Sequence, residues 1–206
     1  MTIQKPKNPK MIDNEVISRT WKFAFDNSEK DDIHGFKHVE RVYDLCIKIG
    51  EKLDANINLL KISVLLHDIG RIDEKHDKLK RNHAEISAEK AFKFLNSQDF
   101  NISQDDINRI IHCIKAHSFS NNITPRTVEA KILSDVDKLD ALGAIGLYRT
   151  IGFTIKKDGG LDQVIEHLEK KILKLKNQLY LDVSKKIAEQ RELIIYDFYK
   201  NILKQK

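Results

Sequence analysis

The chain has few of the residues that break helices or form covalent cross-links. Its 206 residues include eight glycines, three prolines and two cysteines. So few turn-forming residues argue against an all-β protein and favour a helix-rich one. Cys46 and Cys113 lie within apolar helical patterns, so we expect two buried free thiols and no structural disulfide.

Long hydrophobic runs are also absent. No stretch of about 18 apolar residues occurs, and the N-terminal segment MTIQKPKNPKM lacks the apolar region of a signal peptide. We therefore expect a cytoplasmic protein that makes no contact with a membrane. No linker rich in Pro, Gly or Ser divides the chain, which predicts one domain over residues 12–206, preceded by a flexible tail over residues 1–11.

Neither sign of charge dominates the sequence. The chain has 36 Lys and Arg residues against 31 Asp and Glu residues, which gives a net charge of +5. Much of this excess lies in the first ten residues and in the Lys-rich stretch at 169–176. The balance indicates a mild preference for anions. It argues against a long nucleic acid, which usually requires a dense basic face, and it suits a small phosphorylated molecule.

Helical periodicity is the pattern that the sequence does contain. It predicts a compact all-α array of about eight or nine helices. Asn82 with Glu85, and Ser103 with Asp106, have the spacing of helix N-terminal caps. The helices within residues 161–204 are amphipathic and are expected to pack on the rest of the domain or to form a homodimer. The expected helices cover residues 12–27, 36–54, 58–68, 83–96, 103–117, 128–142, 143–153, 161–176 and 182–204.

Several polar residues lie on the apolar faces of these helices. His38 and His117 each share the apolar stripe of their helix, and Asp137 shares a helical row with small and apolar residues. His67 and Asp68 end the apolar run SVLLHDIG. Taken singly, each residue has a structural explanation, such as a hydrogen-bonded core histidine. Together, His38, His67, Asp68 and Asp137 form a mixed nitrogen and oxygen donor set that suits a divalent metal ion.

Three segments, IHGFKHVERV, LLHDIG and SDVDKLDALGAIGLYRT, carry a resemblance to a known family. Their order of H, HD and D resembles the HD-domain superfamily of metal-dependent phosphohydrolases, and the C-terminal IAEQRELIIYDFY is similar to that of its small stand-alone members. The resemblance covers about residues 30–150 and implies an all-α fold with the metal-site core there. It also implies one divalent ion (Mn, Mg, Fe, Ni, Co or Zn) and the metal ligands His38, His67, Asp68 and Asp137.

A second metal ion is a further expectation from the resemblance. Some HD proteins hold two ions with additional histidines between the HD pair and the last Asp. His83 and His117 lie in that interval, so they are candidates for ligands of a second ion or for an acid that assists the leaving group.

The expected reaction is hydrolysis of a phosphoester or phosphoanhydride. Asp68 is the candidate catalytic residue, because one of its oxygens can bind metal while the other orients or deprotonates the attacking water. His76, His112 and His167 are expected at the surface. Four cations follow the motifs and are candidates for binding phosphate: Arg71, Lys75, Lys138 and Arg149.

The substrate stays open at this point. The stand-alone relatives suggest a nucleotide, and possible chemistry includes cleavage of a nucleoside triphosphate to monophosphate and pyrophosphate. The alternatives are a non-catalytic module that senses nucleotides, a nuclease or phosphodiesterase that acts on short oligonucleotides, and a dinuclear iron oxygenase.

Overall fold

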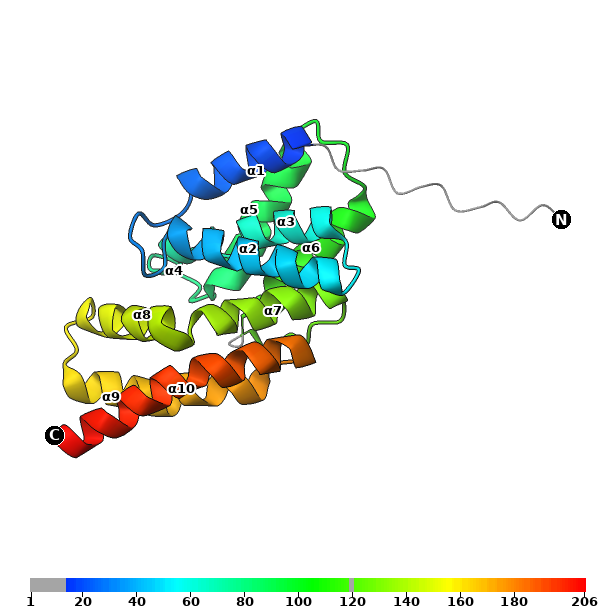
Figure 1. Ribbon diagram of the computed structural model, residues 1–206. Coiled ribbons are helices and arrows are strands. Elements are labelled where there is room, and N and C mark those ends of the chain that lie inside the picture. The colour runs from blue at the N-terminus through cyan, green and yellow to red at the C-terminus, as the bar shows by residue number, and fades with distance from the viewer. Residues whose placement is uncertain (1–13, 119–120) are drawn as a thin grey trace.

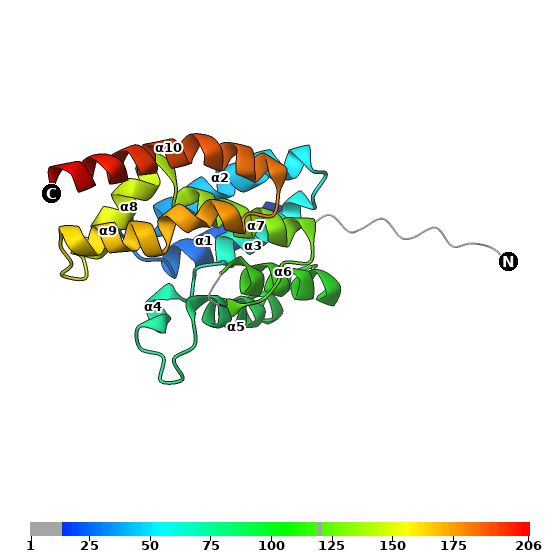
Figure 2. The same cartoon turned by 90° about the horizontal axis from the view of Figure 1, so that it is seen from below.

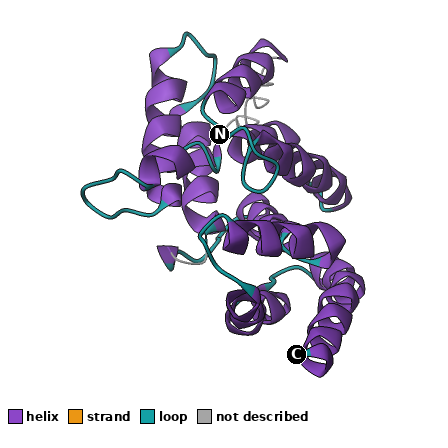
Figure 3. Ribbon diagram, turned by 90° about the vertical axis from the view of Figure 1, so that its left-hand side faces the viewer, coloured by secondary structure: helices purple, strands orange, loops and turns teal. Residues whose placement is uncertain are grey.

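The structure, a computed structural model, describes residues 14–118 and 121–206. The predicted tail over residues 1–11 lies outside these ranges. All regular secondary structure in the described ranges is helical, which confirms the all-α prediction (Figure 3). Apart from the one-turn helix α4 and a 3-10 helix, η2, these ranges contain nine helices. In chain order the elements are α1 (Asn14–Asp26), α2 (Phe36–Lys52), α3 (Ile57–Leu66), α4 (Arg71–Glu74), α5 (His83–Ser97), α6 (Gln104–His117), α7 (Val128–Asp140), α8 (Gly143–Ile155), α9 (Leu161–Lys170), η2 (Ile172–Gln178) and α10 (Asp182–Gln205).

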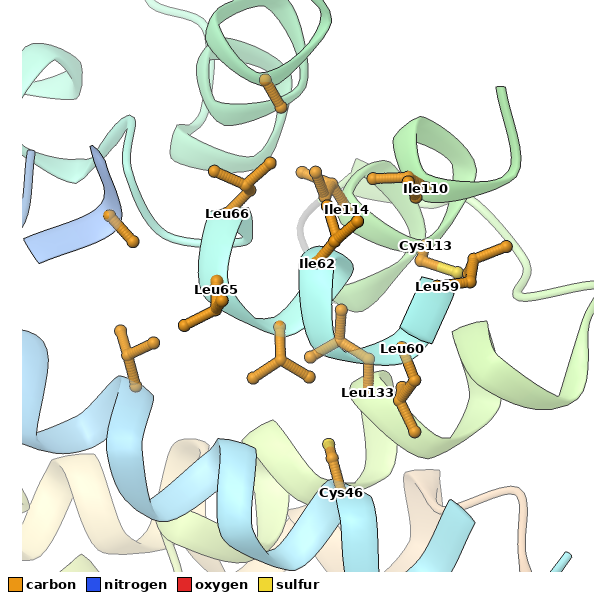
Figure 4. Packing of buried hydrophobic residues seen from close by; sticks show 14 of the residues in the cluster. Cys46, Leu59, Leu60, Ile62, Leu65, Leu66, Ile110, Cys113, Ile114 and Leu133 are labelled. Carbon is orange, nitrogen blue, oxygen red and sulfur yellow. The ribbon is translucent and has the colours of Figure 1, made fainter. Parts of the chain in front are cut away.

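Helix α3 forms the centre of the main hydrophobic core. It is apolar nearly all round and every residue from Leu59 to Leu66 except Lys61 is buried, so it is stable only when other helices enclose it. Helices α1, α2, α6 and α7 supply this enclosure. Figure 4 shows the α3 leucines beside Ile114 of α6 and Leu133 of α7. Cys46 and Cys113 are buried free thiols in the same cluster, as predicted.

The predicted caps start two helices that carry candidate site residues. The Asn82 side chain accepts hydrogen bonds from the first amides of α5, and the Ser103 hydroxyl accepts one from the Asp106 amide at the start of α6. His83 is the first residue of α5 and His117 is the last residue of α6. Because α5 and α6 pack against each other, the two histidines meet.

The C-terminal elements form a second cluster beside α7. Figure 1 shows α9 and α10 on the side of α7 that faces away from α1, and α8 continuing from the end of α7. Apolar residues of these helices pack with Leu139 and Leu142. Asp135 of α7 links α7 to this cluster, because its carboxylate accepts hydrogen bonds from the backbone amides of Tyr180 and Leu181 at 2.9 and 2.8 Å.

Two helices in this layer differ from the prediction. The helix expected over 143–153 runs two residues further, as α8 over Gly143–Ile155. The expected helix over 161–176 ends at Lys170, because the backbone of Lys171 (φ −127°, ψ −63°) leaves the α-helical region and the chain continues as η2. This break directs Lys171 toward the site described below.

Candidate metal centre

The HD pair lies in a turn just after the core helix rather than within it. Helix α3 ends at Leu66, so His67 and Asp68 occupy the turn that leads to α4. Gly70 allows this turn to approach α5, because a Cβ there would lie 2.6 Å from the amide nitrogen of Ser87. The Gly70 amide also donates to the Ser87 hydroxyl at 2.9 Å. The turn therefore places Asp68 against α5 as well as beside α2 and α7.

The four predicted metal ligands come together from three places in the chain. His38 lies in the first turn of α2 and Asp137 in the last turn of α7. The His38 Nε2 atom is 3.6 Å from Asp68 Oδ2 and 3.3 Å from Asp137 Oδ1. The His67 Nε2 atom is 3.5 Å from Asp68 Oδ2 and 4.0 Å from Asp137 Oδ1. Both imidazoles are fully buried, whereas the Asp137 side chain is 21% exposed.

Hydrogen bonds at the outer nitrogens fix both histidines in the form that a metal requires. His38 donates from Nδ1 to Asp140 Oδ2 at 2.7 Å, and His67 donates from Nδ1 to the carbonyl of Val64 at 2.7 Å. Each Nε2 atom therefore presents a lone pair to the centre. Neither Nε2 atom has a hydrogen-bond partner within the described residues, nor has Asp68 Oδ1. Buried polar atoms without partners are costly, and a cation among them removes that cost, so the donor set fits a divalent metal.

A second group of donors shares Asp68. The Nε2 atoms of His83 and His117 lie 3.6 and 3.5 Å from Asp68 Oδ1, and 3.3 Å from each other. His117 donates from Nδ1 to the carbonyl of Ile114 at 2.6 Å, which leaves its Nε2 lone pair toward the same point. The two oxygens of Asp68 thus face two donor groups, either of which could hold a metal ion.

The charges at the centre also suit a cation. Burial lowers the pKa of His67 to about 4 and lowers that of His83, so both imidazoles are neutral at pH 7. Burial alone would raise the pKa of Asp68 and Asp137. The Arg71 guanidinium outweighs burial at Asp68, and the His38 imidazole, 3.3 Å away, outweighs it at Asp137, so both carboxyls keep pKa values well below the usual range. The centre therefore combines the neutral imidazole of His67 with two carboxylates, which is a donor set that attracts a cation.

Asp140 holds His38 from the side away from the metal centre, and no motif in the sequence indicated this role. Its carboxylate accepts from His38, from Arg41 at 2.8 and 2.9 Å, and from Arg149 at 2.6 Å. The sequence signal was its position three residues after Asp137, which puts both carboxylates on one side of α7. Its partners on α2 and α8 could not be identified from that position alone.

A cavity of about 460 Å³ opens beside the centre. Asp137, His83 and His117 form part of its wall. Of the predicted phosphate-binding residues, Arg71, Lys138 and Arg149 line the cavity, whereas Lys75 does not. Lys75 is exposed and pairs with Glu29, because the connection between α4 and α5 projects away from the other helices (Figure 2).

The remaining histidines divide between surface and cavity. His76 is exposed, as predicted, and the half-buried His112 accepts a hydrogen bond from the Arg126 amide at 3.0 Å. His167 differs from the prediction, because α9 folds over α8 and brings this ring into the cavity wall with His34 and Phe153. The Phe153 ring lies 5.1 Å from the His34 ring and 5.7 Å from the His167 ring, centroid to centroid.

Residues 35–142 match the HD domain family. The chain belongs to the HD-domain family. Its HD motif is the His67–Asp68 pair, and the matched residues contain all four predicted metal ligands. No helix of this HD protein, within the residues that the structure describes, is long and apolar enough to cross a membrane.

Several known proteins are similar to this HD protein over most of its length. YpgQ of Bacillus subtilis is 30% identical over 195 residues, which cover 90% of each chain. The crystal structure of YpgQ in complex with ADP superimposes with a TM-score of 0.74 and 28% identity, over 93% of this chain and 95% of that one. An HD-superfamily hydrolase from Bacillus thuringiensis has a TM-score of 0.69 and 26% identity, over 93% of this chain and 96% of its own.

A more distant relative shares only part of its length. Ribonuclease Y of Treponema denticola is 28% identical over 130 residues, which are 63% of this chain and 23% of the ribonuclease. The similarity to HD-superfamily hydrolases therefore supports a hydrolase class for this HD protein, and the substrate requires a separate argument.

Proposed function

We propose that this HD protein is a metal-dependent phosphohydrolase that cleaves a phosphoester or phosphoanhydride of a nucleotide. One observation carries the proposal. Buried imidazole nitrogens and a buried carboxylate oxygen, which have no hydrogen-bond partner in the part of the chain that the structure describes, converge beside a cavity that is lined by cations. The proposed metal ligands are His38, His67, Asp68 and Asp137. A second ion would use Asp68 with His83 and His117, which form a separate donor group.

A bound divalent ion would supply Lewis acidity and a water molecule of lowered pKa. The chain supplies the rest. Asp68 keeps its negative charge despite burial, and its Oδ1 atom accepts no hydrogen bond from the described residues. This oxygen is therefore suited to orient the attacking water and to take its proton. His83 and His117 lie at the same oxygen, so either imidazole could accept the water's proton from Asp68 at Nε2 and pass it to the leaving group.

The cavity suits a molecule that has both a charged and an aromatic part. Arg71 and Lys138 lie next to the proposed ligands in sequence and in space, and they can neutralise a phosphate at the centre. Phe153 offers an aromatic surface for a planar base. The ADP complex of the similar YpgQ supports a nucleotide ligand. Cleavage of a nucleoside triphosphate to monophosphate and pyrophosphate is the specific reaction that we propose.

A phosphodiesterase of short oligonucleotides is the second candidate. The similarity to ribonuclease Y favours it. The modest net charge of +5 and a cavity of only about 460 Å³ favour the mononucleotide. A nucleotide sensor would not need a full set of four ligand residues, so the intact set supports catalysis.

Turnover on a substrate panel tests the proposal. The purified chain is supplied with Mn²⁺, Mg²⁺, Co²⁺, Ni²⁺, Zn²⁺ or Fe²⁺ and assayed for phosphate or pyrophosphate release from nucleoside tri-, di- and monophosphates and from short oligonucleotides. We expect metal-dependent release from at least one nucleotide. His67→Ala should abolish it, while His76→Ala at an exposed histidine should leave it unchanged. Binding of nucleotides with no turnover under any metal would establish the sensor instead.

A further inference from the structure

Five cations line the cavity beside the metal centre, and four of them already have partners. Arg71 is bound to Asp68, and Arg149 to Asp140 and the Ile33 carbonyl. Lys138 donates to the Ser134 carbonyl and hydroxyl at 2.9 and 2.7 Å, and Lys170 pairs with Glu166. The fifth, Lys171, makes no hydrogen bond or ion pair with its side chain among the described residues.

The backbone explains why Lys170 and Lys171 differ. Lys170 is the last residue of α9 and follows Glu166 by one helical turn, so the two side chains lie on the same row. At Lys171 the backbone is no longer α-helical, so this side chain does not continue the row of α9 that contains Glu166 and Lys170. Lys171 therefore lines the cavity with an ammonium group whose three donors pair with no carboxylate of the described residues.

The surroundings of Lys171 favour an anion there. Lys171 is exposed at the edge of the cavity, and the protein packed around it lowers the pKa of its ammonium. Asp137 opposes this effect, and the charges of Arg71 and Arg149 add to it. Because the guanidinium groups of Arg71 and Arg149 add positive charge around this ammonium, a charge-assisted hydrogen bond to a phosphate is favoured there.

We propose that Lys171 binds a phosphate group of the substrate beyond the one that reacts, so that the site selects nucleotides with two or more phosphates. The reacting phosphate lies at the His–Asp centre, where Arg71 and Lys138 are adjacent to Asp68 and Asp137. Lys171 comes from the separate layer of α9 and η2 and reaches the cavity from there. This inference rests on the proposed function and adds the residue that distinguishes the length of the phosphate chain.

Equilibrium binding tests the inference without relying on turnover. Calorimetric titrations with ADP and AMP, in the presence of Mn²⁺, compare the full-length wild type with Lys171→Gln, Lys171→Arg and Lys170→Gln. We expect the wild type to prefer ADP, and Lys171→Gln to weaken ADP binding by about tenfold or more while AMP binding changes less than about twofold. Lys171→Arg should keep the preference because it retains the charge. Lys170→Gln is the matched control and should bind both nucleotides as the wild type does.

The other results would overturn the inference. No wild-type preference for ADP, an equal loss for ADP and AMP in Lys171→Gln, or an equal effect of Lys170→Gln would each show that Lys171 does not recognise the additional phosphate. Failure of the proposed function is a separate result, because a protein that hydrolyses no nucleotide can still show the binding difference.

Discussion

Replacement of Asp140 by asparagine tests whether the support behind His38 controls the metal centre. The Asp140 carboxylate is nearly buried, with 8% of the side chain exposed. It accepts from His38, Arg41 and Arg149 at distances between 2.6 and 2.9 Å. Although burial opposes ionisation, the hydrogen bonds from His38 and Arg41 hold the pKa of Asp140 below its usual range. Asp140→Asn keeps the shape but removes the charge that these three donors share.

Two effects of Asp140→Asn follow from this geometry. Removal of one partner from a buried charge pair leaves the others uncompensated, so we expect the free energy of unfolding to fall by about 2 to 4 kcal/mol. An amide also no longer guarantees the proton on His38 Nδ1, so Nε2 ceases to be a dedicated metal ligand. Loss of such a supporting partner typically lowers metal affinity by about 10- to 100-fold. Urea denaturation measures the first effect and calorimetric titration with Mn²⁺ measures the second.

Asp135→Asn provides the control for this experiment. Asp135 is another buried carboxylate of α7, but it accepts from backbone amides at 180 and 181 and contacts no proposed ligand. We expect this variant to lose stability and to keep its metal affinity. The reasoning would be refuted if Asp140→Asn bound Mn²⁺ as tightly as the wild type, or if both variants lost affinity in proportion to their stability.

Three further predictions concern pH, packing and substrate. In the metal-free folded protein the pKa of His67 is about 4, against an ordinary value of 6.5, so the unfolded chain takes up the proton first as pH falls. The free energy of unfolding should therefore decrease by about 3 kcal/mol between pH 6.5 and pH 4. Urea denaturation of His67→Gln should show a smaller dependence on pH. Gly70→Ala should lower the free energy of unfolding by about 1 to 3 kcal/mol, because the added Cβ would lie 2.6 Å from the α5 backbone. In the control Gly160→Ala the nearest atom lies 3.6 Å from the added Cβ, so this variant should unfold at nearly the wild-type urea concentration. Phe153→Ala should raise the KM for a nucleotide about tenfold and leave that for inorganic tripolyphosphate unchanged, and Tyr148→Ala on the same helix should alter neither.

Local patterns in the sequence were sufficient to predict much of the fold. The caps at Asn82 and Ser103 depend on residues within one turn, and the structure contains both. The apolar character of α3 correctly predicted its burial, since no solvent-facing side is available. Its end was predicted two residues late, because the turn at His67 depends on the close contact between Gly70 and α5 rather than on the helix itself.

The parts of the site that the sequence did not indicate depend on distant partners. Asp140 meets Arg41 across 99 residues of chain, and no periodicity within α7 encodes that contact. Lys171 lies in a stretch of similar lysines, and only the break between α9 and η2 distinguishes it from Lys170. The sequence could also not exclude Lys75 as a phosphate ligand, because its exposure follows from the direction in which the α4–α5 connection leaves the domain.

Measurement of bound metal tests the central claim most directly. The wild type and His67→Ala are equilibrated with Mn²⁺, passed through a desalting column and analysed for metal per chain, with circular dichroism to confirm that both are folded. The donor geometry predicts at least one Mn²⁺ ion per wild-type chain and a large loss in His67→Ala, because the variant lacks a buried Nε2 ligand. A folded wild type that retains no divalent ion, with Mn²⁺ or any other metal of the panel, would contradict the account.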